Sequence, residues 1–243
     1  MPSHSASAIL FRNGTAAASA AQSLLSGQLL ETWPVHDAQT LATALTAADE
    51  ARAQGRFVVF ALDYEVGAVL EAAVPQPEKH AAPIGYVWIF DGAQWLTSAE
   101  ADAWLLSRDA VTAAGCLRGP AGQSAARYAL KLQEIRRAIA EGEIYQVNFT
   151  FPLDVTLYGH PAHVFLKLAQ AQPTAYAVYI DMPEYQVLSF SPELFFEVAD
   201  RQITVRPMKG TAPRAPEAHA DSAYAAALKA SEKNRAENLM IVD

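Results

Sequence analysis

The sequence predicts an α+β (α/β) fold, in which large mixed, mostly antiparallel sheets are flanked by helices. Residues 38–54 carry apolar side chains at helical spacing and are followed by Gly55, which predicts a helix and its end. Residues 147–155 alternate apolar and polar side chains, as a strand with one apolar face does. Between residues 175 and 205, short apolar runs are separated by turn residues, which is typical of an antiparallel meander.

The N-terminal third combines both kinds of element. After the helix at 38–54, apolar runs at 56–62 and 85–90 predict two buried strands, and the proline-containing residues 72–83 between them predict a loop. A short helix is expected at 99–106.

Residues 115–122 contain clustered glycine and proline and lack apolar periodicity, which indicates a linker. We therefore predict an N-terminal α/β subdomain of residues 1–122 and a second part of residues 123–243. Residues 231–243 have a helical pattern but no glycine cap or proline after it, so we expect the N-terminal piece of a longer protein.

The second part begins with an amphipathic helix that Gly142 ends. Its apolar stripe consists of Tyr128, Leu132, Ile135 and Ile139. The strand at 147–155 follows, and then further elements are expected: a helix at 163–170 and strands at 175–180, 186–190, 194–198 and 202–205. Prolines make residues 207–216 irregular, and Asp221 is a candidate N-cap for a final helix.

Composition excludes several classes of function. The net charge of −8 and the absence of a basic cluster argue against a nucleic-acid partner. The apolar runs are shorter than the roughly 18 residues that span a bilayer, and the N-terminus lacks a secretory pattern. The single cysteine, Cys116, cannot form an internal disulfide, which fits a reducing compartment. We expect a cytoplasmic protein and assign Cys116 no role.

Four polar features could carry chemistry, and each also has a purely structural interpretation. The face of Gln146, Asn148 and Thr150 is most simply the solvated face of a strand. Glu193 follows a Ser-Pro turn, where an exposed edge glutamate is the simplest interpretation. If it were buried, it could act as a proton donor.

Lys209 lies in a predicted tight loop, where a lysine is usually a solvated charge. If it were buried beside Arg206 or Arg214, it would lose its proton more readily and could act as a nucleophile. Gly210 would let a ligand approach the backbone, and Thr211 offers a hydroxyl and an amide to a carboxylate.

Lys233 and Glu237 are four residues apart on the predicted final helix, so a surface ion pair is the simplest interpretation. The functional alternative is a Mg²⁺ site, because this ion often needs only one or two carboxylates together with a substrate anion.

Four stretches together resemble the chorismate-utilising enzymes, and among them the component I branch of the aminodeoxychorismate synthases. They are GEIYQVNFT at 142–150, FSPELF at 190–195, RPMKGTAPR at 206–214 and SEKNRAENLMIVD at 231–243. The resemblance implies that the chain has the fold of aminodeoxychorismate and anthranilate synthase component I, in a truncated form. Residues 123–243 would then be the first part of the chorismate-binding catalytic domain, incomplete at its C-terminus.

By this resemblance, Lys209 is the nucleophile that attacks C2 of chorismate and forms a covalent adduct, to which ammonia then adds at C4. Anthranilate and isochorismate synthases usually carry alanine at the position of Lys209. Glu193 is the general acid for the departing 4-hydroxyl. Glu237 is one of two carboxylates that hold Mg²⁺, which in turn binds the ring carboxylate.

The substrate-binding residues implied by the resemblance are Gly210, Thr211 and Gln146. Gln146 occupies the position of the lysine that activates water in isochorismate synthases, so glutamine disfavours that activity. Met208 and Asn234 replace the usual isoleucine and aspartate of the family, and we expect neither to touch a catalytic group.

The resemblance implies an enzyme that converts chorismate and ammonia into 4-amino-4-deoxychorismate, on the route to 4-aminobenzoate and folate. A glutamine amidotransferase subunit would supply the ammonia. Anthranilate synthase component I, or a non-catalytic fragment of a chorismate-binding enzyme, is the alternative. We expect residues 1–243 alone to be inactive, because the family places the second metal carboxylate and the carboxylate-binding arginine later in the sequence.

Overall fold

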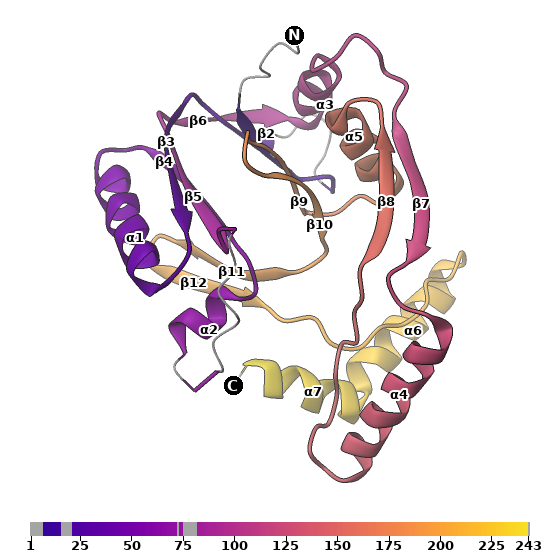
Figure 1. Cartoon of the computed structure of the whole chain (residues 1–243). Helices are drawn as coiled ribbons and strands as arrows, with labels where there is room; N and C mark the ends of the chain where they lie inside the picture. Colours follow the sequence, from indigo (N-terminus) through magenta and orange to yellow (C-terminus); the bar gives the residue numbers. More distant parts are fainter. Residues whose placement is uncertain (1–6, 16–20, 72, 75–81, 243) are drawn as a thin grey trace. The chain divides into compact units, whose positions relative to one another are not determined.

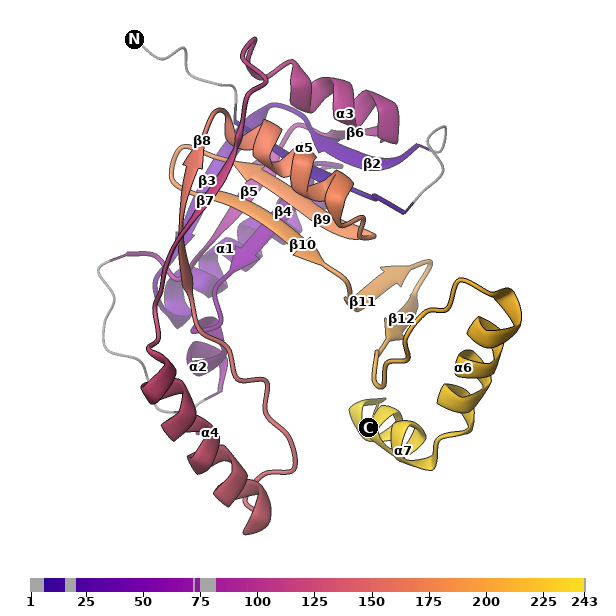
Figure 2. The ribbon, with the colours of Figure 1, turned by 90° about the vertical axis from the view of Figure 1, so that its right-hand side faces the viewer.

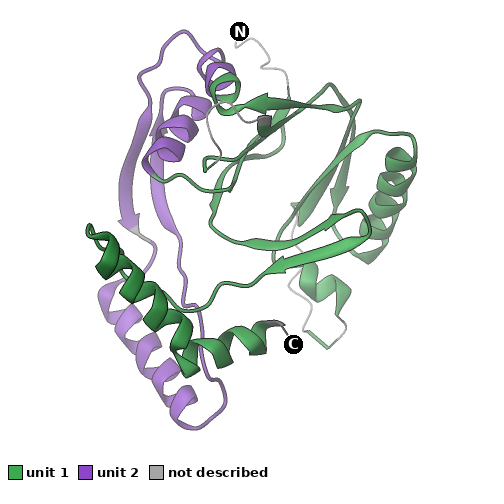
Figure 3. Cartoon of the chain, turned by 180° about the vertical axis from the view of Figure 1, so that it is seen from behind, with its two compact units in different colours: residues 1–101, 172–243 green, residues 102–171 purple. Residues whose placement is uncertain are grey.

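The computed structural model describes all residues of the chain except 1–6, 16–20, 72, 75–81 and 243. Its contacts divide the chain into two compact units (Figure 3), residues 1–101 with 172–243, and residues 102–171. The predicted division into residues 1–122 and 123–243 stays a prediction. No helix in the described ranges is both long and apolar enough to cross a membrane.

The first unit contains a five-stranded antiparallel sheet in the order β10-β9-β1-β2-β6 (Figure 1). Its strands are β1 (Ala8–Arg12), β2 (Ala21–Ser26), β6 (Ala93–Thr97), β9 (Tyr176–Asp181) and β10 (Gln186–Ser191). Ile9 and Leu10 of the central strand are fully buried, and β1 pairs with β9, a strand distant in the sequence. The predicted strands at 175–180 and 186–190 are therefore confirmed.

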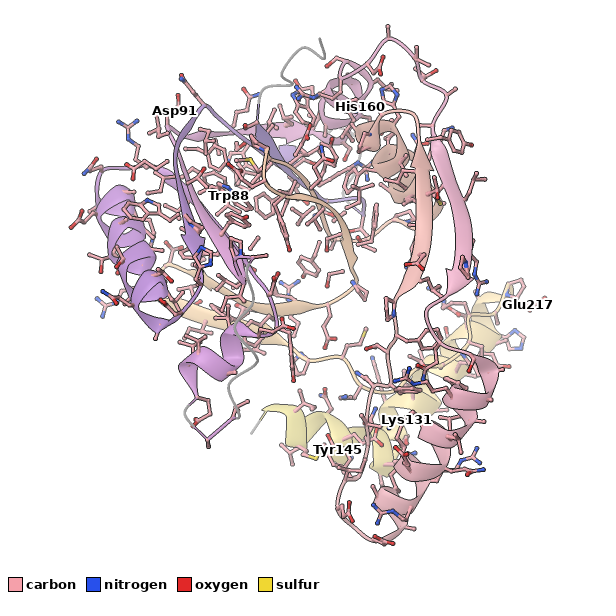
Figure 4. All side chains as sticks on the ribbon, in the orientation of Figure 1. Trp88, Asp91, Lys131, Tyr145, His160 and Glu217 are labelled. Atoms are coloured by element: carbon pink, nitrogen blue, oxygen red, sulfur yellow. The ribbon has the colours of Figure 1, made fainter. Side chains whose placement is uncertain are left out.

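A second sheet of this unit has the order β3-β5-β4, with strands β3 (Leu29–Val35), β5 (Gly85–Phe90) and β4 (Phe57–Leu62). Helix α1 (Ala38–Ala53) packs on it, and the short helix α2 (Val66–Leu70) follows β4. Trp88 of β5 is fully buried (Figure 4) and joins Ile9 and Ile180 of the first sheet in one apolar cluster. The two sheets of this unit thus share a core.

The predicted helix at 38–54 forms because both of its ends are specified locally. The Asp37 side chain accepts a hydrogen bond from the backbone N–H of Thr40 at 2.8 Å, and the Thr40 hydroxyl accepts one from the N–H of Asp37 at 3.0 Å. Gly55 after the helix has φ +75°, a conformation that glycine adopts without strain. The loop expected at 72–83 lies largely outside the described residues.

Strands β11 (Leu194–Ala199) and β12 (Gln202–Arg206) form a separate hairpin, from which the chain continues into α6 (Ala218–Ala230) and α7 (Glu232–Val242) (Figure 2). Asp200 and Arg201 make its turn with positive φ values of 49° and 65°. The expected continuous meander is wrong, because β10 and β11 belong to different sheets. Between them the Ser191 hydroxyl bonds both the N–H and the C=O of Glu193, which removes these groups from strand pairing.

The predicted final helix is two helices. Glu217 is the N-cap of α6, so the assignment of this role to Asp221 is wrong, and Asp221 lies in the first turn. The chain leaves helical geometry at Ser231, where ψ is 114°, and α7 then starts with the Ser231 hydroxyl accepting a bond from the N–H of Asn234 at 3.3 Å. Residues 207–217 are irregular, as expected.

The second unit begins within α3 (Ser98–Leu106) and contains β7 (Gly115–Ala121), α4 (Ala125–Ala140), β8 (Leu153–Tyr158) and α5 (Pro161–Ala171). The predicted linker at 115–122 is wrong, because residues 115–121 form β7, paired with β8. A Cβ on Gly119 would lie 2.8 Å from the carbonyl oxygen of Asp154, so here glycine permits close strand approach.

The predicted strand at 147–155 is also largely wrong. Only its last residues belong to β8, and residues 146–152 have no regular structure. Helices α4 and α5 are confirmed where the sequence expected them, although no residue of α4 is buried. In α5 the buried His163 ring lies between two backbone carbonyl oxygens, 3.0 Å from that of Val111 and 3.2 Å from that of Leu106.

Candidate active site

The β11–β12 hairpin places two predicted catalytic residues at the same end. Leu194 at the start of β11 lies opposite Arg206 at the end of β12. Glu193 directly precedes this pair, and the loop that carries Lys209 directly follows it. The antiparallel register therefore brings together residues that are 16 positions apart in the sequence.

Glu193 holds the loop that carries Lys209. Its side-chain oxygen Oε1 accepts a hydrogen bond from the backbone N–H of Met208 at 3.0 Å. Glu193 itself is exposed, while Lys209 is half-buried. Met208 thus touches a predicted catalytic group through its backbone, contrary to the expectation from sequence, although any residue except proline could make this bond.

Gly210 lies against helix α7. Its φ is +74°, and a Cβ added to it would lie 2.7 Å from both Cγ and Oδ1 of Asn234. Only glycine combines this backbone conformation with so close a neighbour. The expectation that Asn234 touches no catalytic group stays a prediction, but its side chain does abut Gly210, a predicted substrate-binding residue.

The two arginines near Lys209 in the sequence, Arg206 and Arg214, are both exposed. Arg214 donates from Nε to Asp221 Oδ1 at 2.7 Å, and the N–H of Ala215 donates to the same oxygen at 3.1 Å. The hydrogen bond from Arg214, followed by that from Ala215, holds the pKa of the Asp221 carboxyl below its usual value. Two bonds to one carboxylate thus fix the irregular segment to the start of α6.

Glu237 lies on α7, one helical turn after Asn234 and on the same face. Its side chain is 29% exposed, and Lys233 Nζ lies 3.9 Å from its Oε1. The simple interpretation of this pair as an ion pair is confirmed. A single half-buried carboxylate fits one ligand position of a Mg²⁺ ion, and within the described ranges no group of three or more metal-binding side chains surrounds it.

The other two predicted substrate-binding residues differ in their setting. Thr211 is exposed and directly follows Gly210 in the loop. Gln146 belongs to the second unit, where it is exposed in the irregular segment between α4 and β8. Its part in substrate binding stays a prediction.

An apolar surface adjoins Glu193. A hollow of about 640 Å³ is lined by Glu193, Leu194, Phe195, Phe196, Ile203, Val205, Pro207 and Ile241. Within it Phe195 is 85% exposed and Ile203 is 71% exposed. Glu193, Ile241 of α7 and Pro207, which begins the loop that carries Lys209, therefore border one surface rich in exposed apolar side chains.

Comparison with known proteins gives this arrangement a context. The family described as chorismate binding enzyme matches residues 117–243. The aminodeoxychorismate synthase of Streptomyces pristinaespiralis is 37% identical over 189 residues, which cover 76% of this chain and 26% of the relative. Aminodeoxychorismate synthase component 1 of Escherichia coli (strain K12) is 38% identical over 117 residues, 48% of this chain and 26% of the relative.

A relative with a different name is nearly as similar. Anthranilate synthase component 1 of Methanothermobacter thermautotrophicus is 36% identical over 117 residues, 48% of this chain and 25% of the relative. The chain thus spans about a quarter of the length of these three proteins.

Proposed function

Because the chain belongs to the family of chorismate-binding enzymes, we propose that its full-length parent is an aminodeoxychorismate synthase component I. It would convert chorismate and ammonia into 4-amino-4-deoxychorismate, for 4-aminobenzoate and folate biosynthesis. The observation that carries this proposal is the placement of Glu193 and Lys209 at one end of the β11–β12 hairpin, joined through the N–H of Met208.

Lys209 supplies the nucleophile in this proposal. Its amine adds to C2 of chorismate as the 4-hydroxyl departs, and ammonia then adds to C4 as the lysine leaves. A hydroxyl leaves readily only when it is protonated, which is the task of Glu193 as general acid. Gly210 contacts the substrate through its backbone in this proposal, on a side other than the one that the Asn234 side chain occupies.

Glu237 is the residue of this chain that would hold Mg²⁺. When bound, the ion neutralises negative charge on the substrate and orients its ring carboxylate. One carboxylate leaves room for substrate oxygens and for a second protein carboxylate, which we expect in the remaining part of the catalytic domain.

The parent requires more than this chain for activity in our proposal. The chain spans about a quarter of its relatives, and the hairpin and α7 expose apolar side chains such as Phe195 and Leu239. We therefore expect residues 1–243 alone to be inactive. A glutamine amidotransferase subunit would deliver ammonia to the full-length enzyme.

The direct test is to incubate the full-length protein with chorismate, ammonium and Mg²⁺ and to identify the product. We expect 4-amino-4-deoxychorismate, and we expect Lys209→Ala to abolish both turnover and any covalent adduct seen by intact-protein mass spectrometry. Lys229→Ala, which removes an exposed lysine of α6, is the matched control. If Lys209→Ala kept the wild-type rate with ammonia, Lys209 would not be the nucleophile.

Anthranilate synthase component I remains the second candidate, since relatives with that name are similar over the same part of the chain. Formation of anthranilate and pyruvate in the same incubation would establish this alternative. A full-length protein that binds chorismate but converts it to neither product would instead indicate a non-catalytic chorismate-binding protein.

A further inference from the structure

Lys209 lies between two backbone positions that neighbouring side chains restrain. On one side, Glu193 accepts the N–H of Met208 at 3.0 Å. On the other side, the Asn234 side chain fills the space where a Cβ of Gly210 would lie, 2.7 Å from that position. The first restraint comes from the hairpin and the second from helix α7.

Asn234 is itself well placed to fix the loop. Its backbone N–H donates to the Ser231 hydroxyl at 3.3 Å, which anchors it in the first turn of α7. Its side chain is half-buried, and Glu237 follows one turn later on the same helix face. One rigid helix therefore presents both the side chain that abuts the Lys209 loop and the carboxylate proposed to bind the metal.

We propose that Asn234 is a positioning residue that fixes Lys209 relative to Glu237, an inference that rests on the proposed function. Asn234 acts through Gly210 and touches no reacting atom. Because the loop has no regular structure, removing the Asn234 side chain leaves Gly210 free to shift toward the vacated space. A shift of about 1 Å in a nucleophile is enough to slow the chemical step about a hundredfold.

The test uses the full-length protein and a single turnover with chorismate and Mg²⁺ but without ammonia, with the covalent adduct followed by intact-protein mass. The rate constant reports the geometry of Lys209, and the amplitude reports the fraction of folded enzyme. Asn234→Ala should lower the rate constant about tenfold to hundredfold and leave the amplitude unchanged. Asn234→Asp, which keeps the shape of the side chain, should restore most of the rate.

A second measurement does not depend on chorismate. Hydrogen exchange of the Met208 amide reports whether the loop is held, and Asn234→Ala should make it about tenfold faster. Asn238→Ala is the matched control, because Asn238 is an exposed asparagine one turn later on the same helix. It should change neither exchange nor rate.

The outcomes separate this inference from the function on which it rests. If the wild type forms the adduct but Asn234→Ala has the same rate constant, or lowers only the amplitude, the positioning role is overturned. If the wild type forms no adduct while Asn234→Ala still accelerates exchange at Met208, the proposed function fails and the restraint of the loop by Asn234 stands. Unchanged exchange in Asn234→Ala overturns the restraint itself.

Discussion

The carboxylate of Glu193 accepts a hydrogen bond at 3.0 Å from the backbone N–H of Met208, the residue directly before Lys209. One side chain is therefore linked both to the expected proton transfer and to the position of the expected nucleophile. Loss of Glu193 would remove two contributions at once, so a simple alanine variant cannot separate them. The chemistry of the side chain offers a way to do so.

Glu193→Gln should keep the loop in place but stop proton donation. The amide oxygen of glutamine still accepts the Met208 N–H, whereas its NH₂ group is no acid at neutral pH. We expect amination by the full-length enzyme to fall about a hundredfold or more, with exchange of the Met208 amide unchanged. Glu193→Ala should lose activity and also accelerate that exchange.

The control for these variants is Glu197→Gln, which alters an exposed glutamate of β11 opposite Thr204. It should leave activity and exchange at wild-type values. Wild-type amination in Glu193→Gln would contradict the general-acid role, and faster exchange in that variant would contradict the loop-holding role.

Gly210→Ala should destabilise the full-length protein more than a glycine-to-alanine substitution elsewhere. A side chain at φ +74° strains the backbone, and the new Cβ would also lie only 2.7 Å from the Asn234 side chain. Gly55→Ala is the matched control, because Gly55 has φ +75° and nothing lies within 4 Å of its added Cβ. Both should lose roughly 1 kcal/mol of unfolding free energy from backbone strain.

Gly210→Ala should lose a further 1 to 3 kcal/mol, approximately, from overpacking. Denaturant unfolding of the two variants measures this difference, and initial rates should show loss of activity only for Gly210→Ala. Equal losses of stability in the two variants would mean that the loop moves away from Asn234 without cost.

The sequence predicted the elements whose signals are local. Helix α1 has its capping box at Asp37 and its terminating glycine at Gly55 within one stretch, and the apolar runs of β4 and β5 need no distant partner to be recognised. Strand β1 was not predicted, because its identity depends on pairing with β9, about 170 positions away. The glycines of residues 115–121 wrongly predicted a linker for a related reason. They allow β7 to approach β8 closely, and this contact is visible only in three dimensions.

In the candidate site, too, some residues could be predicted from the sequence and others could not. Glu193, Lys209 and Glu237 could be identified from motifs, because each carries a reactive group in a recognisable stretch. The part played by Asn234 could not, because asparagine near a helix start is common and its contact with Gly210 depends on how the loop returns to α7. The bond from Met208 to Glu193 involves a backbone group, which no side-chain pattern reveals.

Asp221 should contribute to stability at neutral pH and lose that contribution in acid. Arg214 and the N–H of Ala215 lower the pKa of its carboxyl relative to the unfolded chain. The contribution is therefore complete above the unfolded pKa of about 3.9 and disappears as pH falls through the lower folded value. Denaturant unfolding of wild type and Asp221→Asn should differ at pH 7 and converge toward pH 2.

High salt provides the control for Asp221, since the Arg214 side chain is 89% exposed and its attraction to the carboxylate is screened. The difference in unfolding free energy between wild type and Asp221→Asn at pH 7 should shrink at a salt concentration of about 1 M. At that concentration the Debye length is only about 3 Å, so the attraction between the two exposed charges is largely screened. A difference that grows as pH falls would contradict the pKa shift.

Lys233 should compete with Mg²⁺ for Glu237. Its ammonium lies 3.9 Å from Oε1 of that carboxylate and is 83% exposed, so the ion pair itself should stabilise the fold by less than about 0.5 kcal/mol. Lys233→Ala removes a positive charge next to the proposed metal ligand, and the full-length enzyme should then reach half-maximal rate at about half the wild-type Mg²⁺ concentration. Glu237→Gln should raise that concentration at least about tenfold, because it removes a charged ligand.

The control for Lys233→Ala is Lys229→Ala, which removes an exposed lysine of α6. It should leave the Mg²⁺ concentration for half-maximal rate unchanged, which separates a local effect from a change in net charge. An increased Mg²⁺ requirement in Lys233→Ala would mean that Lys233 orients Glu237 for the metal rather than competing with it.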